Sequence, residues 1–299
     1  MKLGQVKWNG AVTAAVFEGG LARPIPDYTV VDLILRAEKE GETLPGLATR
    51  LATRHPLAAE PLIPLQPREV WACGSTYESS ALERDNRIGN VFCMQAHRAE
   101  RPEILFKGTA RVCVGPGQAI GIRPDSSFTA PAPELALILG ANGRILGYTL
   151  ANDLSACDLE FENPLYRTQA KSYTASCALG SLVTTADEIT DPRGIEIRCE
   201  ISRNGSILFS SSASTAQMER RLESLVEYLL LANPVPAGSV LLTGSGIRVP
   251  RSAALEPGDQ VSIRSEQLGE LHNPAMLLGY SPEASSASGS MLSRRSAPA

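Results

Sequence analysis

The chain has 299 residues, of which 43% are hydrophobic and 20% are charged, with a formal net charge of −4. This composition predicts a globular protein with a sizeable core. The Lys and Arg residues are scattered, which argues against a nucleic-acid-binding surface and a cationic membrane-binding stripe. The amino-terminal segment contains no apolar run long enough for a signal core or a membrane span. The six cysteines include no CxxC pair, so they predict neither a disulfide framework nor a zinc ribbon, and we expect a reducing, cytoplasmic location.

Residues 1–66 predict a small N-terminal α/β domain, because short strand-like and helix-like segments alternate in it. Apolar residues from Val30 begin a predicted helix that should end near Gly41, and a second helix is predicted over residues 46–59. The Pro-rich stretch at residues 61–67 cannot continue a helix. We therefore place a domain boundary after residue 66.

The following segment, residues 67–280, predicts a domain dominated by antiparallel β-structure. Two Asn-Gly dipeptides, at residues 142–143 and 204–205, lie between alternating apolar segments. This arrangement is the strongest short-range signal for a β-hairpin. A single long helix is predicted over residues 215–232, where the apolar residues recur at helical spacing.

Two further strands are predicted, over residues 239–243 and 260–264. The fold class that follows is α+β, with the small N-terminal domain succeeded by a mainly antiparallel β-roll or β-sandwich. The last segment, residues 281–299, is rich in Ser and Ala and has almost no core-forming residues. We predict that this tail is disordered.

The first Asn-Gly turn brings two acidic residues together. If residues 142–143 form a two-residue loop, Glu134 lies opposite Ala151, and position 132 lies opposite Asp153. Alternate residues share a sheet face, and directly opposed Cβ atoms lie roughly 5 Å apart, so Glu134 and Asp153 project to one side. Two such carboxylates suit a hard cation such as Mg²⁺. On spacing alone, a pair of solvated positions on an exposed face is the simpler interpretation.

Several sequence strings resemble one known family. The central strings are Glu-Asn-Pro-Leu-Tyr at 162–166, Gln-Ala-Lys at 169–171 and Ser-Cys-Ala-Leu-Gly at 176–180. Weaker support comes from Trp-Ala-Cys-Gly-Ser-Thr-Tyr at 71–77, Glu-Ile-Leu-Phe-Lys at 103–107 and Leu-Thr-Gly-Ser-Gly at 242–246. Together they resemble the fumarylacetoacetate hydrolase family, and within it the branch of 2-keto-3-deoxy-sugar-acid dehydratases. The resemblance covers roughly residues 67–275 and implies the fold of that family.

The resemblance also implies a metal site. Members of the family hold Mg²⁺ with a Glu-x-Glu pair and a later Asp, and the second Glu and the Asp match Glu134 and Asp153. The first Glu is missing, because this chain has Ala132 at that position. We therefore expect a weakened Mg²⁺ site, with Mn²⁺ and Ca²⁺ as alternatives, in which water and a chelating substrate supply the remaining ligands.

Further residues receive roles through the resemblance. Lys171 matches a lysine that pairs with the substrate carboxylate or polarises its 2-oxo oxygen, and a surface lysine is the alternative. Glu103 matches an acidic residue that could act as a general acid/base, although it could equally form a surface salt bridge. Thr243 matches a substrate-facing threonine, and the alternative is a hydroxyl bonded to backbone. The expected substrate-binding residues are Ser75, Tyr77, Ser80, Arg84, Lys171 and Thr243.

Two departures from the family concern the expected cleft: related enzymes carry Arg where Cys157 stands and Gly where Phe161 stands. Three functions therefore compete. The first is a Mg²⁺-dependent hydro-lyase acting on a 2-oxo-3-deoxy sugar acid or a related 2-oxo acid. The second is C–C hydrolysis, decarboxylation or tautomerisation of a dicarbonyl acid. The third is a non-catalytic member that lost its full metal site. The resemblance also implies a homodimer, with no nucleic-acid or membrane partner.

Overall fold

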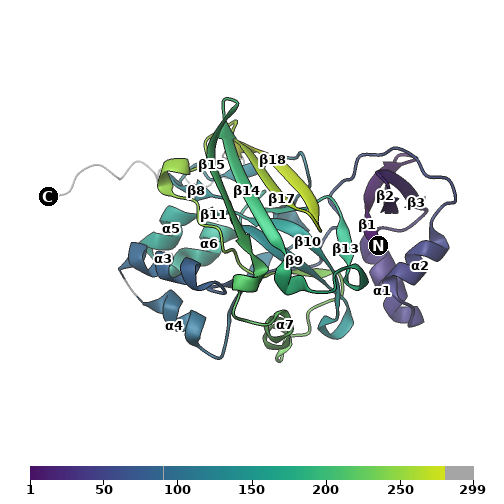
Figure 1. Cartoon of the computed structure of the whole chain (residues 1–299), viewed down its shortest axis with the longest axis horizontal. Coiled ribbons are helices and arrows are strands. Elements are labelled where there is room, and N and C mark those ends of the chain that lie inside the picture. The colour runs from purple at the N-terminus through teal and green to yellow at the C-terminus, as the bar shows by residue number, and fades with distance from the viewer. Residues whose placement is uncertain (90, 280–299) are drawn as a thin grey trace, which may run out of the picture.

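The computed structural model describes residues 1–89 and 91–279 (Figure 1). The tail predicted to be disordered, residues 281–299, lies outside the described residues. Within the described part, no helix is long and apolar enough to cross a membrane. The α+β class is confirmed, because two large sheets are accompanied by helices on several sides (Figure 1).

An eleven-stranded mixed sheet forms the centre of the molecule. β9 pairs antiparallel with both β10 and β16, whereas β16 pairs parallel with β4. Its strands run in the order β3 (Leu21–Ile25), β2 (Ala11–Glu18), β1 (Lys2–Trp8), β13 (Val183–Thr185), β10 (Ile145–Asp153), β9 (Pro133–Leu139), β16 (Ser239–Leu242), β4 (Val70–Gly74) and β5 (Glu103–Gly108), and β12 (Cys177–Leu179) pairs with both β10 and β6 (Cys113–Val114).

A five-stranded sheet and a short ribbon complete the β-structure. The five-stranded sheet has the order β15 (Ser206–Ser214), β14 (Glu196–Arg203), β17 (Gln260–Ser265), β18 (Gly269–Leu277) and β7 (Ile120–Ile122), and the ribbon pairs β11 (Ser155–Ala156) with β8 (Thr129–Ala130). The α-helices of the described part are α1 (Val30–Glu40), α2 (Leu44–Leu51), α3 (Glu78–Ile88), α4 (Phe92–Arg98), α5 (Cys157–Glu162), α6 (Arg167–Lys171) and α7 (Leu222–Leu230).

The N-terminal strands extend the central sheet, because β1 pairs antiparallel with β13. The proposed boundary after residue 66 stays a prediction. The predicted end of the first helix is confirmed: α1 begins after the N-cap Thr29 and ends at Gly41, which adopts the left-handed conformation that glycine tolerates. The second helix was predicted too long. It ends at Leu51, and Leu57 instead forms an isolated β-bridge with Ala22.

β9 is buried on both faces and separates two hydrophobic cores. Its odd-numbered leucines pack in the core that includes the five-stranded sheet. The even-numbered Ala136 and Ile138 pack in a second core with residues of α1 and α2. Because side chains alternate along a strand, Glu134 belongs to the face of Ala136 and Ile138. Glu134 therefore lies near the start of β9, on the face that packs in the second core.

The predicted pairing around the acidic residues is confirmed. Glu134 lies opposite Ala151 in the β9–β10 ladder. The N–H of Asp153 donates a hydrogen bond of 2.9 Å to the carbonyl of Ala132, so position 132 also lies opposite Asp153. Both carboxylates therefore come from one hairpin, as the alternation of its residues indicated.

The turn of this hairpin differs from the predicted two-residue loop. Asn142 and Gly143 have φ values of 54° and 73°, which an Asn-Gly turn accommodates. The carbonyl of Arg144 accepts a hydrogen bond of 2.8 Å from the N–H of Gly140, which leaves three residues in the loop. A β-bulge at Leu146 takes up the additional residue, and the predicted register resumes at the next position.

The long helix predicted over residues 215–232 is wrong in its first half. Only α7 is α-helical, and a short 3₁₀-helix occupies Thr215–Gln217. Met218 forms a β-bridge with Tyr77, and the guanidinium of Arg220 donates to backbone carbonyls at the end of α4. These tertiary contacts hold the segment in an extended conformation before the helix begins.

Candidate active site

A cleft lies at one edge of the central sheet, where β9 and β5 begin and where β10, β16 and β4 end. Its lining includes Glu134, Asp153, Lys171 and Glu103, together with Ala132. One hairpin, β5 and α6 thus bring three acids of the sheet and a lysine to one place. The sequence alone connected only the first two by geometry.

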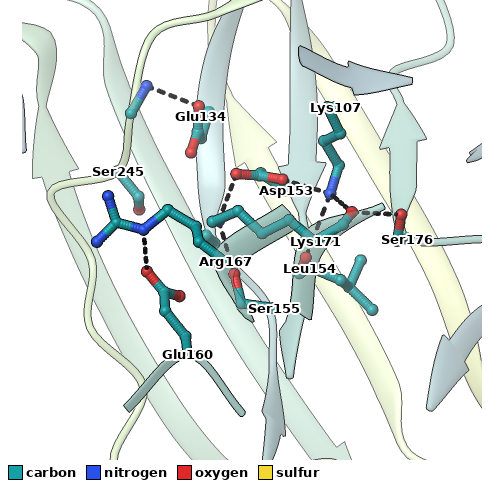
Figure 2. Close-up of polar contacts among 12 residues, drawn as sticks. Lys107, Glu134, Asp153, Leu154, Ser155, Glu160, Arg167, Lys171, Ser176 and Ser245 are labelled. Atoms are coloured by element: carbon teal, nitrogen blue, oxygen red, sulfur yellow. Dashed lines mark hydrogen bonds and ion pairs between the residues drawn. The ribbon is translucent and has the colours of Figure 1, made fainter. Parts of the chain in front are cut away.

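Asp153 at the end of β10 is held between two lysines (Figure 2). Its Oδ1 lies 2.6 Å from Nζ of Lys107, and its Oδ2 accepts a hydrogen bond of 2.7 Å from Nζ of Lys171. Burial alone would raise the pKa of Asp153, but the positive charges of Lys107 and Lys171 outweigh this effect and lower it. The carboxylate is therefore kept ionised in spite of being buried.

Lys107 is completely buried, which a lysine tolerates only with several partners. Besides Asp153, its Nζ donates to the carbonyl oxygens of Lys171, at 2.6 Å, and Leu154, at 3.3 Å. The Nζ of Lys171 also donates to Oγ of Ser155 at 2.7 Å. The two lysines thus have different positions: Lys107 lies beneath the site, whereas Lys171 lines the cleft.

Glu134 is also buried, and its Oε2 accepts a hydrogen bond of 2.6 Å from the backbone N–H of Gly244. Burial, followed by the nearby charge of Asp153, raises the pKa of Glu134 well above its ordinary value. The carboxyl groups of Glu134 and Asp153 face the same space in Figure 2. A positive charge placed between them would favour the ionised form of both.

The donor set at this place fits Mg²⁺ with few protein ligands. Two carboxylates line the cleft, and Ala132, which lies opposite Asp153, supplies no oxygen ligand. Among the residues described in the structure, no group of three or more His, Cys, Asp and Glu side chains is arranged to hold a metal. Mg²⁺ prefers oxygen ligands and commonly keeps several waters, so Glu134 and Asp153 could hold it only with water or substrate oxygens.

Glu103 lies at the start of β5 in a cradle formed by β4 and the residue after it. Its carboxylate pairs with Arg167 and accepts a hydrogen bond of 2.9 Å from the hydroxyl of Ser75. A methyl group on Gly74 would overlap this carboxylate, so any larger residue there would displace Glu103 from its present position. The carbonyl of Ser75 in turn contacts Nδ1 of His97 at 2.8 Å. Glu103 is therefore held in the cleft by Arg167 and by Ser75.

Glu160 of α5 is a further buried acid of the cleft. It pairs with Arg84 and with Arg167, whose Nε lies 3.3 Å from its Oε1. Burial opposes ionisation, but the charges of Arg84, Lys171, Arg167 and Arg248 prevail and lower the pKa of Glu160 to about 2. Glu103 and Glu160 thus share the guanidinium groups of Arg84 and Arg167.

These cleft residues fall within a segment, residues 69–275, that matches the family model described as "Fumarylacetoacetate (FAA) hydrolase C-terminal". The chain belongs to the fumarylacetoacetate hydrolase family. It is 43% identical over 217 residues to a "2-dehydro-3-deoxy-D-arabinonate dehydratase" of Saccharolobus solfataricus, covering 71% of this chain and 72% of that protein. It is 38% identical over 213 residues to a "Probable 2-keto-3-deoxyxylonate dehydratase" of Haloferax volcanii, covering 71% and 73%.

A solved structure shows the same architecture. It is described as "2-keto-3-deoxy-D-arabinonate dehydratase complexed with magnesium and 2,5-dioxopentanoate" and matches with a TM-score of 0.79 at 34% identity. The match covers 94% of this chain and 100% of that chain. The expectation of a fumarylacetoacetate hydrolase fold is therefore confirmed.

Within this family fold, most of the predicted site residues meet in the cleft. Ser75, Ser80, Arg84, Glu103, Glu134, Asp153 and Lys171 all line it. Ser75 and Arg84 contact Glu103, and the hydroxyl of Ser80 donates to the carbonyl of Ser245 at 2.6 Å. Ala132, Cys157 and Phe161, the three departures from the family pattern, line it as well. The substrate-binding roles predicted for Ser75, Ser80, Arg84 and Lys171 stay predictions.

Two predicted substrate-binding residues are not among those that line the cleft. Tyr77 is buried in the hydrophobic core, with its ring against Gly246. Thr243 is fully buried, and its hydroxyl donates to the carbonyl of Leu135 at 2.9 Å, which was the alternative considered for it. Both side chains are buried in this structure, and their roles in substrate binding stay predictions.

Sequence reasoning missed several residues that the structure places in or beneath the cleft. Lys107 ends the family-like string at residues 103–107, but a β-bulge at this residue interrupts the alternation of β5, so the period of the strand does not place it. Glu160 and Arg167 flank the family-like string at residues 162–166 but belong to no recognised motif. Their roles follow from the ion pairs of Glu160 with Arg84 and Arg167, which depend on the packing of α5 and α6.

Proposed function

We propose that the chain is a Mg²⁺-assisted hydro-lyase that removes water from a 2-keto-3-deoxy sugar acid. The observation that carries this proposal is the meeting of a lysine, Lys171, and a separately held acid, Glu103, with the two carboxylates Glu134 and Asp153 in one cleft. The dehydratase names of the two relatives and the ligands of the matching structure support the same reaction.

The reaction requires one proton transfer and one departing hydroxyl group. In a 2-keto-3-deoxy acid, the proton at C3 is acidified by the adjacent 2-oxo group, and the hydroxyl on C4 is the leaving group. Taking the C3 proton and delivering a proton to the C4 hydroxyl forms a C3–C4 double bond and one water. A single carboxylate next to both atoms can carry out both transfers.

The chain supplies groups for each step. We assign Glu103 as the group that exchanges the proton, because Arg167 and Ser75 fix its carboxylate at the cleft. We assign Lys171 to the C1 carboxylate or the 2-oxo oxygen, where its ammonium group would stabilise negative charge. Glu134 and Asp153 would hold Mg²⁺, which when bound supplies a Lewis acid for the 2-oxo oxygen.

The direct test is to measure loss of one water from 2-keto-3-deoxy-D-arabinonate and 2-keto-3-deoxy-D-xylonate by mass spectrometry, with saturating Mg²⁺. We expect turnover by the unchanged chain and a decrease in kcat of at least about 100-fold for Glu103→Gln. The matched control is Glu196→Gln on β14, which removes an exposed carboxylate and should leave kcat unchanged. No water loss by the unchanged chain would contradict the proposal and favour a non-catalytic family member.

Metal binding is tested separately by calorimetry with Mg²⁺ or Mn²⁺, with and without oxalate as a mimic of a 2-oxo acid. Because Ala132 supplies no ligand, we expect weak binding by the chain alone and tighter binding with oxalate, which adds two oxygen ligands. Asp153→Ala should abolish both. Equal affinity with and without oxalate would contradict a site that depends on substrate oxygens.

We further propose that the chain forms homodimers in the cytoplasm. Large apolar side chains such as Leu165, Ile207 and Leu231 are exposed on the described surface, which supports association with a second copy. All six cysteines are free thiols, which supports a reducing compartment. A monomeric mass in sedimentation equilibrium at micromolar concentration would contradict the dimer.

A further inference from the structure

Besides Arg84, two further arginines line the cleft. Arg87 of α3 and Arg248, which follows β16, both belong to its lining. The guanidinium of Arg87 pairs with Glu83, one helical turn before it, and Nε of Arg248 lies 3.5 Å from the other oxygen of the same carboxylate. One carboxylate therefore serves two guanidinium groups.

The other acids of the cleft are already engaged. Arg84 and Arg167 pair with Glu103 and Glu160, so these four charges balance. Asp153 is held by its two lysines. Within the described part of the chain, Glu83 is the only carboxylate recorded in an ion pair with Arg87 or Arg248. Arg87 and Arg248 thus share one carboxylate as their ion-pair partner, and the charge of Arg248 also acts on Glu160.

The arrangement of Arg87 is fixed by two aromatic rings. Its guanidinium carbon lies 5.5 Å from the ring centroid of Phe128 and 5.6 Å from that of Phe161. Cation–π contacts of this kind hold a guanidinium in place while leaving its N–H groups free to donate. Phe161 lines the cleft, so one of the two rings that hold Arg87 belongs to the cleft wall.

The arginine pair and Lys171 belong to one continuous cleft. Cys157 lines the cleft, and the charges of Arg248, Lys171 and Arg87 all act on its thiol. A substrate of several carbons could therefore contact Lys171 with one end and the arginines with the other.

We infer that Arg87 and Arg248 form a subsite for a second anionic group, a carboxylate or a phosphate ester, at the end of the substrate remote from its 2-oxo acid. Guanidinium groups bind both anions through paired, charge-assisted hydrogen bonds. This inference rests on the proposed function for the 2-oxo acid end. It specifies the substrate class as a doubly anionic 2-keto-3-deoxy sugar acid.

The subsite is tested first by binding, without turnover. 2-Oxoglutarate and 2-oxopentanoate have the same five carbons and the same 2-oxo acid, and only the former has a distal carboxylate. With Mg²⁺ present, calorimetry should show 2-oxoglutarate binding at least about tenfold more tightly, as expected for a charge-assisted hydrogen-bond pair. Equal affinities would overturn the inference, and so would failure of both ligands to bind at millimolar concentration.

Three variants locate the effect. Arg248→Gln and Arg87→Gln should each reduce the affinity ratio of the two ligands toward one, whereas Glu83→Gln should increase it by removing the competing carboxylate. The matched control is Arg251→Gln. Arg251 lies 5.6 Å from the centroid of Phe128 but does not belong to the lining of the cleft, so its removal should leave the ratio unchanged. A ratio that is insensitive to both Arg87 and Arg248 would overturn the inference.

Turnover then separates the carboxylate from the phosphate and the subsite from the proposed function. The substrates are 2-keto-3-deoxyhexonate, the same acid with a terminal carboxylate, and the same acid with a terminal phosphate ester. Whichever of the two doubly anionic substrates has the larger kcat/KM shows whether the subsite prefers a carboxylate or a phosphate ester. Turnover with no preference for either would overturn the subsite alone. Selective binding of 2-oxoglutarate with no water loss from any substrate would overturn the proposed function alone.

Discussion

Replacement of Glu160 by glutamine should destabilise the protein at neutral pH and much less in acid. Glu160 is 5% exposed and lies between Arg84 and Arg167. Its pKa is about 2 in the folded chain, compared with an ordinary value of 4.5. At about 1.4 kcal/mol for each pH unit, this difference corresponds to about 3 kcal/mol of folding free energy.

The direction of the pH dependence of stability follows from the lowered pKa of Glu160. A carboxyl group with a lower pKa in the folded state contributes stability that is complete above its unfolded pKa and is lost as the pH falls through its folded pKa. Of the roughly 3 kcal/mol present at pH 7, about 2 kcal/mol should be gone at pH 3. The difference in unfolding free energy between the unchanged chain and Glu160→Gln should therefore shrink by about that amount.

The assay is urea denaturation of both proteins at several pH values between 7 and 3. Glu256→Gln is the control, because it removes an exposed partner of Arg203 and should change the unfolding free energy by less than about 1 kcal/mol. If the stability curves of the unchanged chain and Glu160→Gln ran parallel from pH 7 to 3, the assignment of a strongly stabilised carboxylate would be refuted.

Three further substitutions probe the cleft. Ala132→Glu should tighten Mg²⁺ binding at least about tenfold in calorimetry, because the new carboxylate faces Asp153; unchanged affinity would show that this position is not a ligand position. Gly74→Ala should lower kcat about 100-fold, because its methyl group displaces the carboxylate of Glu103, and an unaltered kcat would remove Glu103 from the mechanism. Lys107→Met should lower the unfolding free energy by about 3 kcal/mol in urea denaturation, since a buried carboxylate loses a charged partner. A loss below about 1 kcal/mol would mean that Asp153 is sufficiently held by its other lysine.

The acidic hairpin could be predicted from the sequence because its determinants are local. An Asn-Gly turn and alternating apolar residues fix which side chains share a face, and parity alone placed Glu134 and Asp153 together. The prediction of a helix over residues 215–232 was wrong in its first half because the determinants there are not local. Its apolar spacing is helical, but Met218 pairs with Tyr77 and Arg220 binds the end of α4, and neither partner is close in sequence.

Burial in the site was the least predictable property. A fully buried lysine is rare, so Lys107 gave no signal of its own, and its partners come from two other segments of the chain. Tyr77 and Thr243 were placed in the correct part of the fold, but the orientation of their side chains depends on core packing and backbone hydrogen bonds. Charge compensation between distant segments likewise decided the position of Glu160.

The bulge at Leu146 gives the β9–β10 hairpin tolerance to changes in length. Because the loop and the bulge both lie between Ile138 and Gly147, which are paired, a residue gained or lost within this interval need not alter the pairing beyond it. Glu134 and Asp153 lie on the far side of that pair. Insertions and deletions can therefore accumulate at the turn during evolution while the spacing of the two carboxylates is preserved, so turn length is a poor guide to whether a relative retains this site.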